Sequence, residues 1–264
     1  MLELKNISKT FNAGTVNQKV ALNGLNLTMN EGDFVTVIGG NGAGKSTMLN
    51  AIAGVFQVDT GKILIDGVDV TALPEYKRAK YIGRVFQDPM MGTAATMQIE
   101  ENLALAARRG KPRTLRPGIT KADREFYKEQ LRILDLGLED RMTTKVGLLS
   151  GGQRQALTLL MATLQQPKLL LLDEHTAALD PKTAAKVLTL SDQIVEENGL
   201  TTLMITHNMK DAIQHGNRLI MMDAGRVVVD ISGEEKKKLT VPDLLALFSR
   251  ASGSEEADDK LLLS

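Results

Sequence analysis

A nine-residue glycine-rich segment restricts the fold of this chain more than any other feature. It consists of Gly39-Gly40-Asn41-Gly42-Ala43-Gly44-Lys45-Ser46-Thr47 and matches the pattern G-x-x-x-x-G-K-[ST] without a mismatch. The apolar, β-branched run 34–38 before it predicts a buried strand, and residues 45–53 predict a helix that ends at Gly54. A glycine-rich turn that matched by chance would not need both flanking elements. The segment is therefore predicted to be a phosphate-binding loop.

The residue types in this loop suit the binding of a nucleoside triphosphate. Glycines let backbone N–H groups converge on an anion, and the N-terminus of the following helix adds a partial positive charge. We expect Lys45 to reach the β- and γ-phosphates and the Ser46 hydroxyl to bind Mg²⁺. The loop does not indicate how the energy of the nucleotide is used. The nucleotide-binding candidates within it are Gly39, Asn41, Gly42, Ala43, Gly44, Lys45, Ser46 and Thr47.

The composition argues against several classes of protein. The 264 residues include 32 basic and 32 acidic side chains, so no global charge would attract nucleic acid or an anionic membrane. Because the chain has no cysteine, it can form neither disulfides nor thiolate metal sites. The first residues lack the regions of a signal peptide, and no run of 18 apolar residues predicts a membrane span. These features are typical of a globular protein that does not cross a membrane on its own.

Two adjacent carboxylates follow an apolar run at residues 169–172. This run predicts a buried parallel strand, and α/β sheets bind ligands at the carboxyl ends of such strands. Neighbouring side chains on an extended segment point in different directions, so the two acids should have different roles. We expect Asp173 to support Mg²⁺, mostly through water, and Glu174 to act as general base on an attacking water. An acidic strand end leading into a turn is the alternative, but the phosphate-binding loop upstream argues against it.

A second glycine-rich segment begins a helix that is predicted to extend to about residue 164. Ser150 is placed as its N-cap, followed by Gly151, Gly152 and Gln153. Exposed backbone N–H groups at a helix N-terminus form an anion site. One nucleotide seldom needs two such loops from one chain, so this segment is predicted to contact a nucleotide held by another copy. An ordinary N-cap is the alternative, although it would not require the glycine pair.

Single residues near three predicted strand ends leave two interpretations open. For Phe11, position alone favours packing in the core over stacking on a nucleotide base. Gln87 could reach Mg²⁺ or water, but a loop glutamine is the commoner case. His207 could donate to a γ-phosphate, but a lone histidine is usually structural. The other two histidines, His175 and His215, are given structural roles.

The distribution of elements predicts an α/β fold with a P-loop NTPase core and a mainly parallel sheet. Residues 2–9 and 25–29 alternate between apolar and polar side chains, which predicts an N-terminal antiparallel β subdomain. An Asp66-Gly67 pair between alternating runs predicts a hairpin turn. Residues 223–225 are predicted to connect the two strands of a second, closing hairpin.

The middle of the chain has a different pattern from the flanking α/β segments. Apolar residues at helical spacing in 100–109 and 121–136 predict a helical subdomain inserted at about 88–165. The loop 108–116 carries five basic residues, which could bind lipid headgroups or an acidic partner or could simply be solvated. We expect one domain over residues 1–250, followed by a flexible tail at 251–264.

In this order, the segments resemble the nucleotide-binding subunit of an ATP-binding cassette (ABC) transporter over roughly residues 1–248. The resemblance implies that Phe11 stacks on adenine and that Gln87, His207 and Asp180 belong to the ATP site. The matching segments are 39–47 (Walker A), Gln87 (Q-loop), 149–153 (the signature LSGGQ), 169–174 (Walker B), 178–180 (D-loop) and His207 (switch histidine).

The resemblance also implies a mechanism and partners. Two cassettes would close head to tail on two ATP molecules, each held between one copy's P-loop and the other's Ser150–Gln153 segment. Closure would drive membrane permease subunits, whose coupling helices enter a groove beside the helical subdomain with Gln87 at its hinge. Such a subunit is expected at the cytoplasmic face of the cell membrane as a peripheral protein, without a nucleic-acid partner.

One departure and one local pattern refine this expectation. The family usually has Pro-Thr-Ser after its Walker B acids, where this chain has His175-Thr176-Ala177. The acids are unchanged, so hydrolysis is still expected. The pattern from Gln87 through Met91-Gly92-Thr93-Ala94, with the basic loop at 108–116 and the pair His175-Thr176, resembles a bacterial subgroup. That subgroup serves amino-acid (tryptophan- or tyrosine-like) importers with a substrate-binding lipoprotein. The alternatives are an exporter ATPase subunit, or a soluble ABC ATPase, which usually carries a coiled-coil insertion or second cassette that this chain lacks.

Overall fold

Two β-sheets organise the computed structural model, which describes residues 1–111 and 117–252. The smaller sheet has the strand order β2-β1-β4-β5 and is antiparallel. The Asp66-Gly67 pair connects its last two strands with φ angles of 53° and 76°, which confirms the predicted hairpin. Its strands are β1 (Leu2–Phe11), β2 (Lys19–Met29), β4 (Thr60–Ile65) and β5 (Val68–Asp69).

The larger sheet has the order β10-β9-β3-β8-β7-β6. Its strands are parallel except for the edge strand β10, which pairs antiparallel with β9. All five residues of β3 are buried, as the apolar run before the P-loop predicted. The strands are β3 (Phe34–Ile38), β6 (Ile82–Val85), β7 (Leu169–Asp173), β8 (Thr202–Ile205), β9 (Arg218–Asp223) and β10 (Arg226–Ser232).

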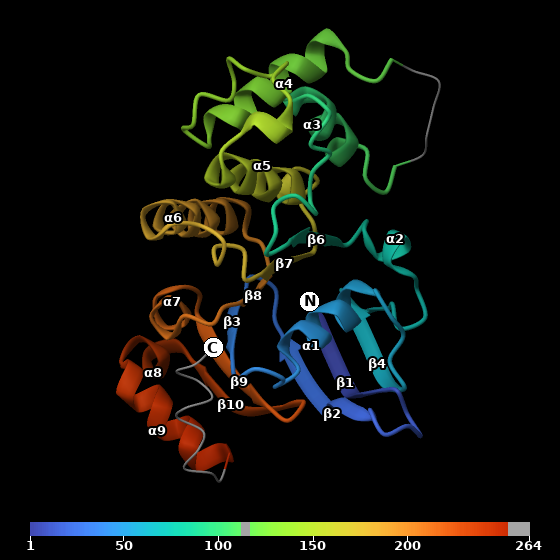
Figure 1. The fold of residues 1–264 in the computed structure, drawn as a ribbon, viewed down its shortest axis with the longest axis vertical. Helices are drawn as coiled ribbons and strands as arrows, with labels where there is room; N and C mark the ends of the chain where they lie inside the picture. Colours follow the sequence, from blue (N-terminus) through green and yellow to red (C-terminus); the bar gives the residue numbers. More distant parts are fainter. Residues whose placement is uncertain (112–116, 253–264) are drawn as a thin grey trace.

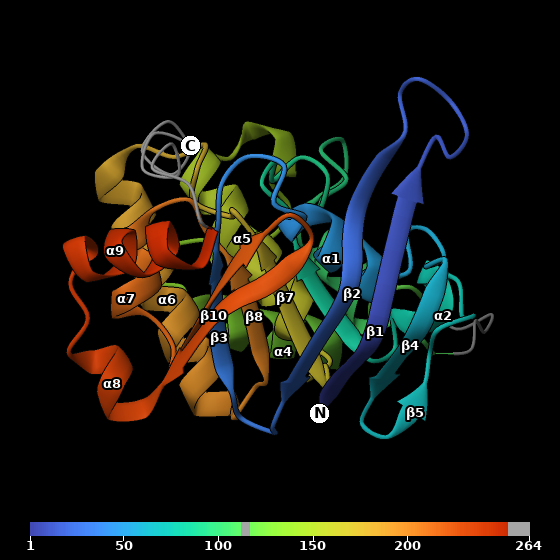
Figure 2. The same ribbon diagram turned by 90° about the horizontal axis from the view of Figure 1, so that it is seen from below.

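The larger sheet is covered on both faces (Figures 1 and 2). On one face, side chains such as Val35 and Leu171 share a core with α1 (Lys45–Ala53) and the smaller sheet. On the other face, Leu170 and Leu172 pack with α5 (Gly151–Thr163) and α6 (Pro181–Asn198). Further along that face lie α7 (Met209–Gln214) and α9 (Val241–Ser252). This is the α/β architecture that the sequence predicted, with a mainly parallel sheet and a separate antiparallel β subdomain.

A block of helices extends from one end of the larger sheet, beyond β6 and β7 (Figure 1). It contains α3 (Ile99–Ala107), α4 (Lys121–Arg132) and α5, which enclose a core of their own that includes Leu103, Leu131 and Leu157. That this block is a subdomain bounded by residues 88 and 165 stays a prediction. Two short helices, α2 (Glu75–Arg78) and α8 (Gly233–Lys237), were not predicted.

Three predicted segments differ in extent from the structure or lie partly outside it. The helix predicted over 121–136 ends at Arg132, and Asp135 has a φ of 51°. Residues 112–116 of the basic loop and residues 253–264 of the predicted tail lie outside the described residues. Among the described residues, no helix has the length and apolar character needed to span a membrane.

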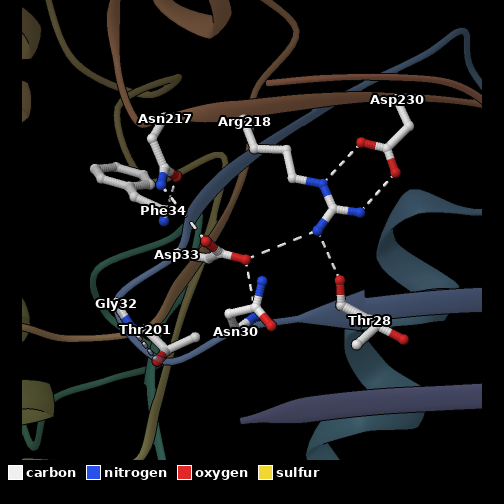
Figure 3. A network of polar contacts seen from close by, with 9 residues as sticks. All are labelled: Thr28, Asn30, Gly32, Asp33, Phe34, Thr201, Asn217, Arg218 and Asp230. Atoms are coloured by element: carbon white, nitrogen blue, oxygen red, sulfur yellow. Dashed lines mark hydrogen bonds and ion pairs between the residues drawn. The ribbon is translucent and has the colours of Figure 1, made fainter. Parts of the chain in front are cut away.

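A polar network around Arg218 connects the two sheets at the amino end of the parallel strands (Figure 3). The Arg218 guanidinium donates to both carboxylate oxygens of Asp230 at 2.7 and 2.6 Å. Its third nitrogen donates to the Thr28 carbonyl oxygen at 2.6 Å and lies 3.7 Å from Asp33. Because Thr28 belongs to β2 and Arg218 to β9, the network fixes the smaller sheet to the larger one, at the opposite end of β3 from the P-loop.

Candidate active site at the carboxyl ends of the parallel strands

The P-loop connects β3 to α1 and is held against the smaller sheet. Gly44 adopts a φ of 101°, and a Cβ atom there would lie 2.6 Å from the backbone oxygen of Ala21 in β2. Only glycine fits this position without moving β2. The Ala43 carbonyl accepts a hydrogen bond from the Gly225 N–H in the β9–β10 turn at 3.0 Å. The loop is therefore shaped by both sheets.

The Lys45 side chain is buried inside the curve of this loop. Its ammonium donates to the carbonyl oxygens of Gly39 at 2.5 Å and Gly40 at 3.2 Å. Burial lowers the pKa of Lys45, and the nearby Glu174 carboxylate opposes that shift. Ser46, next in sequence, is exposed. The structure thus brings the P-loop lysine and the Walker B glutamate into one electrostatic environment, as the sequence predicted.

Glu174 lies where β7 and β8 end side by side. Its N–H donates to the Ile205 carbonyl oxygen at 3.0 Å, and its carboxylate lies 3.8 Å from Nδ1 of His207. The residue adopts a φ of 44°, so the expectation of an extended segment through Glu174 was wrong. The left-handed backbone separates its side chain from that of Asp173, and the strand assignment ends at Asp173. That the two acids have different roles stays a prediction.

Asp173 has an arginine partner that sequence reasoning missed. The Arg84 Nη2 donates to the Asp173 carboxylate at 3.1 Å and to Asn50 Oδ1 at 2.7 Å. Both members of the ion pair are largely buried. The signal available in the sequence was a basic residue within the strand that precedes Gln87, which is unusual in an otherwise apolar core element.

The signature segment caps α5 as predicted. Ser150 Oγ accepts from the Gln153 N–H at 3.3 Å, while Gln153 Oε1 accepts from the Ser150 N–H at 3.2 Å. A Cβ at Gly152 would lie 2.2 Å from a methyl carbon of Thr183 on α6. Close packing within one chain therefore already requires glycine at this position, so the glycine pair does not by itself point to a second copy. Gly151 lies near Leu179 of the same chain.

Two other predicted site residues are exposed. Asp180 is the N-cap of α6, where its Oδ1 accepts from the Thr183 N–H at 3.1 Å. That hydrogen bonding lowers the pKa of the Asp180 carboxyl. Gln87 follows β6, and its side chain is exposed. Roles for both residues at a nucleotide stay predictions.

Phe11 is the last residue of β1. It pairs with Lys19 of β2, whose Nζ lies 3.5 Å from the place where a Cβ of Gly42 would be. The Phe11 ring is partly exposed and makes an edge-to-face contact with Phe56, with the ring centres 5.3 Å apart. The predicted aromatic residue is therefore close to the loop, and its stacking on adenine stays a prediction.

The structure brings some of the predicted site residues together and leaves the signature segment apart from them. Lys45, Glu174 and His207 meet at the carboxyl ends of β3, β7 and β8, with Asp173 beside them. Within residues 1–111 and 117–252, no hydrogen bond or ion pair connects Ser150–Gln153 with the P-loop. One chain thus carries two separate parts of the predicted ATP site.

Comparison with known proteins shows the family of the chain. The ABC transporter family matches residues 22–177, more than half of the chain. The chain belongs to this family. It is an ATP-binding cassette that hydrolyses ATP. The matched residues contain the P-loop, the signature segment and both Walker B acids.

Two curated relatives match the cassette along nearly its whole length. The tyrosine transport ATP-binding protein of Clostridioides difficile (strain R20291) is 45% identical over 251 residues, which are 95% of this chain and 100% of that protein. The phosphonates import ATP-binding protein PhnC of Lactobacillus acidophilus is 34% identical over 263 residues, with 98% of each chain covered.

Solved structures of cassettes have the same fold. The post-hydrolysis dimer of the ATP-binding cassette MJ0796, bound to ADP and Pi, superposes with a TM-score of 0.75 at 33% identity. That match covers 88% of this chain and 98% of MJ0796. A nucleotide-free cassette matches with the same TM-score at 24% identity, which supports the fold alone.

The donor atoms near the P-loop fit a magnesium ion that is bound together with a nucleotide. The described residues contain no cluster of three or more His, Cys, Asp or Glu side chains that could hold a metal by themselves. Mg²⁺ commonly binds through one or two protein oxygens, several waters and substrate phosphates. Ser46 and Asp173 supply a hydroxyl and a carboxylate of this kind. Bound there, the ion would neutralise charge on the phosphates.

Proposed function

We propose that this cassette is the ATPase subunit of an amino-acid importer and that it works as a dimer on two Mg–ATP. The observation that carries the amino-acid assignment is its 45% identity to a tyrosine transport ATP-binding protein over 95% of this chain and 100% of that protein. The retained site residues support turnover, since Lys45, Asp173, Glu174 and His207 are all present and lie together. The phosphonate-import relative supports import as the direction of transport but does not point to an amino acid as the substrate.

In the proposed dimer, each ATP is bound by residues of both copies. Lys45 and Ser46 of one copy hold the phosphates and Mg²⁺, and Ser150–Gln153 of the other copy faces the γ-phosphate. The separation of these two segments within one chain supports this arrangement, as does the dimer with ADP and Pi in a related cassette. Asp180, which immediately precedes α6, would lie near the junction between copies.

A groove in the cassette suits a membrane permease subunit. It has a volume of about 1450 Å³ and lies between the α2 region and helices α3 and α5. The exposed apolar side chains Tyr76, Met91 and Leu105 line it, and Lys80 and Arg108 add positive charge. Exposed apolar groups with basic neighbours favour a short amphipathic helix that carries acidic residues. Docking of such a helix would place the cassette at the cytoplasmic face of the membrane.

Transport in vesicles tests the substrate and the direction of transport. The cassette would be reconstituted with the permease encoded beside its gene, and with the neighbouring binding lipoprotein if one is encoded. We expect ATP on the cassette side to drive uptake of radiolabelled tyrosine or tryptophan from the opposite side. Movement of the amino acid away from the cassette side would indicate an exporter. Stimulation of ATP hydrolysis by a different substrate class, with no amino-acid transport, would contradict the amino-acid assignment.

A further inference from the structure

The Arg84 guanidinium connects two elements of the proposed Mg–ATP site. Its Nη2 donates to Asn50 on α1 at 2.7 Å and to Asp173 at the end of β7 at 3.1 Å. The helix that begins with the P-loop lysine and the strand that delivers the Walker B aspartate are therefore tied through one nitrogen. A movement of α1 or of the end of β7 would therefore displace Arg84 and alter its hydrogen bond to the other element.

Strand register explains why Arg84 reaches Asp173. In the parallel pair of β6 and β7, Arg84 lies opposite Leu171. Asp173 is two residues beyond Leu171, so its side chain emerges on the same face of the sheet. The side chains of Arg84 and Asp173 are 13% and 16% exposed, respectively. At such burial, opposite charges interact more strongly than they would at a water-exposed surface.

The remaining surroundings of Arg84 restrict its movement. The guanidinium carbon lies 4.5 Å from the centre of the Phe86 ring, which suits a cation–π contact. The Arg84 Nε is buried and has no hydrogen-bond partner within the part of the chain that the structure describes. Buried polar groups are usually hydrogen-bonded, so this Nε is an exception in the protein interior. The side chain is thus stacked in place with its hydrogen bonds directed at Asn50 and Asp173.

We propose that Arg84 is a positioning residue for the metal of bound ATP. It holds Oδ2 of Asp173 and so leaves the other carboxylate oxygen to interact with the water shell of Mg²⁺. The inference rests on the proposed Mg–ATP site. Arg84 and Phe86 also line the groove that is proposed for the permease. The Arg84–Asp173 contact therefore connects that groove to the proposed metal site.

Metal binding without turnover tests this role. In Glu174→Gln protein with saturating ATP, binding of Mn²⁺ would be followed from the EPR signal of the free ion. We expect Arg84→Met to raise the Kd for Mn²⁺ about tenfold, while the Kd for ATP in EDTA stays the same. Arg84→Lys keeps the charge but cannot maintain both contacts in the same geometry, so it should weaken Mn²⁺ binding by a smaller factor.

Whether Mn²⁺ binding weakens or tightens in Arg84→Met distinguishes a role of Arg84 in orienting Asp173 from a purely electrostatic role. A guanidinium that acted only through its charge would repel the metal, and its removal would tighten Mn²⁺ binding. Unchanged or tighter binding in Arg84→Met would therefore overturn the proposal. Arg109→Met is the matched control, because Arg109 is another groove arginine that donates to a backbone oxygen, that of Ala162, at 2.8 Å. It should leave Mn²⁺ binding unchanged.

Two further outcomes are decided by the same measurements. If Arg84→Met does not fold, Arg84→Lys is judged by the same criterion, so weaker Mn²⁺ binding supports the proposal and unchanged binding contradicts it. If the Glu174→Gln parent shows no ATP-dependent Mn²⁺ binding at all, the Mg–ATP site itself is refuted. That result would contradict the proposed function before any Arg84 variant is compared.

Discussion

At the scale of single residues, the site depends on where strands end. Glu174 and His207 follow β7 and β8, and Lys45 follows the loop after β3, so parallel pairing alone brings them to one edge. This much could be predicted, because the carboxyl ends of parallel strands coincide. The left-handed conformation of Glu174 could not, since no glycine or turn pattern in the local sequence requires it.

Replacing Glu174 by glutamine tests the general base. The substitution keeps size and hydrogen bonding but removes the basic oxygen, so turnover should fall by about 10²–10⁴-fold while ATP binding persists. Steady-state phosphate release and equilibrium binding of a fluorescent ATP analogue measure the two effects. Glu196→Gln, at an exposed position on α6, is the control and should keep full activity. Rapid hydrolysis by Glu174→Gln would exclude Glu174 as the base.

His175, the residue after Glu174, is held in place by a contact with Ser191 on α6. It is buried, and its Nε2 lies 3.0 Å from Ser191 Oγ. The Ser191 hydroxyl donates to the Val187 carbonyl oxygen at 2.8 Å, which matches a neutral imidazole that carries its proton on Nε2. Burial lowers the pKa of His175 to about 4. The structural role expected for this histidine thus has a specific partner.

This depressed pKa predicts acid sensitivity of the fold. Above pH 6.5 the imidazole is neutral in both the folded and the unfolded chain, and the full stability is present. Between pH 6.5 and 4 only the unfolded chain takes up the proton, so the free energy of unfolding should fall by about 3 kcal/mol. Urea unfolding at several pH values measures this. His175→Gln should lose that part of the pH dependence, and an unchanged slope in the variant would contradict the assignment.

At the scale of elements, α5 and α6 pack unusually closely where the signature segment begins. Gly152 of α5 lies against Thr183 in the first turn of α6, which Asp180 caps. The signature segment and the D-loop of one chain are therefore joined by the packing of α5 against α6. A movement of one element is expected to carry the other with it.

A pair of substitutions tests this contact. Gly152→Ala should destabilise the protein by about 1–3 kcal/mol, because the new methyl group would overlap the Thr183 methyl. Adding Thr183→Ser removes that methyl and should recover the loss, since alanine is the better helix former. Urea unfolding of the single and double variants gives the coupling. Equal destabilisation of Gly152→Ala with and without Thr183→Ser would show that the two residues do not interact.

Elements were easier to predict than the contacts between them. Most strands follow from a local apolar pattern, and the hairpins at Asp66-Gly67 and 223–225 follow from their turn residues, whereas the first six residues of β2 and its connection to β1 were not predicted. The end of α4 was placed too far along because apolar residues continue at helical spacing after Arg132. The Arg84–Asp173 pair spans 89 residues of sequence, and only the register of β6 and β7 brings it together. The Gly152–Thr183 contact likewise depends on helix packing that no local pattern contains.

At the scale of the whole molecule, the two parts of the proposed ATP site lie in different regions of the fold. The P-loop precedes α1, and the signature segment begins α5. Figure 1 places α1 beside the smaller sheet and α5 beside α6, and no hydrogen bond or ion pair among the described residues joins the P-loop to the signature segment. A second copy in head-to-tail orientation would bring them together. The groove beside the helical block would then transmit closure of the dimer to the permease.

The most direct test is to combine the trap for ATP with a change in the signature segment. Glu174→Gln protein should form a dimer when Mg–ATP is added, as measured by light scattering during gel filtration. Adding Ser150→Arg should leave a monomer that still binds ATP with the affinity of the parent, because in the proposed dimer Ser150 would contact only the partner's nucleotide. If the double variant loses ATP binding as a monomer, Ser150 belongs to the same chain's site, and the account of a shared site is wrong.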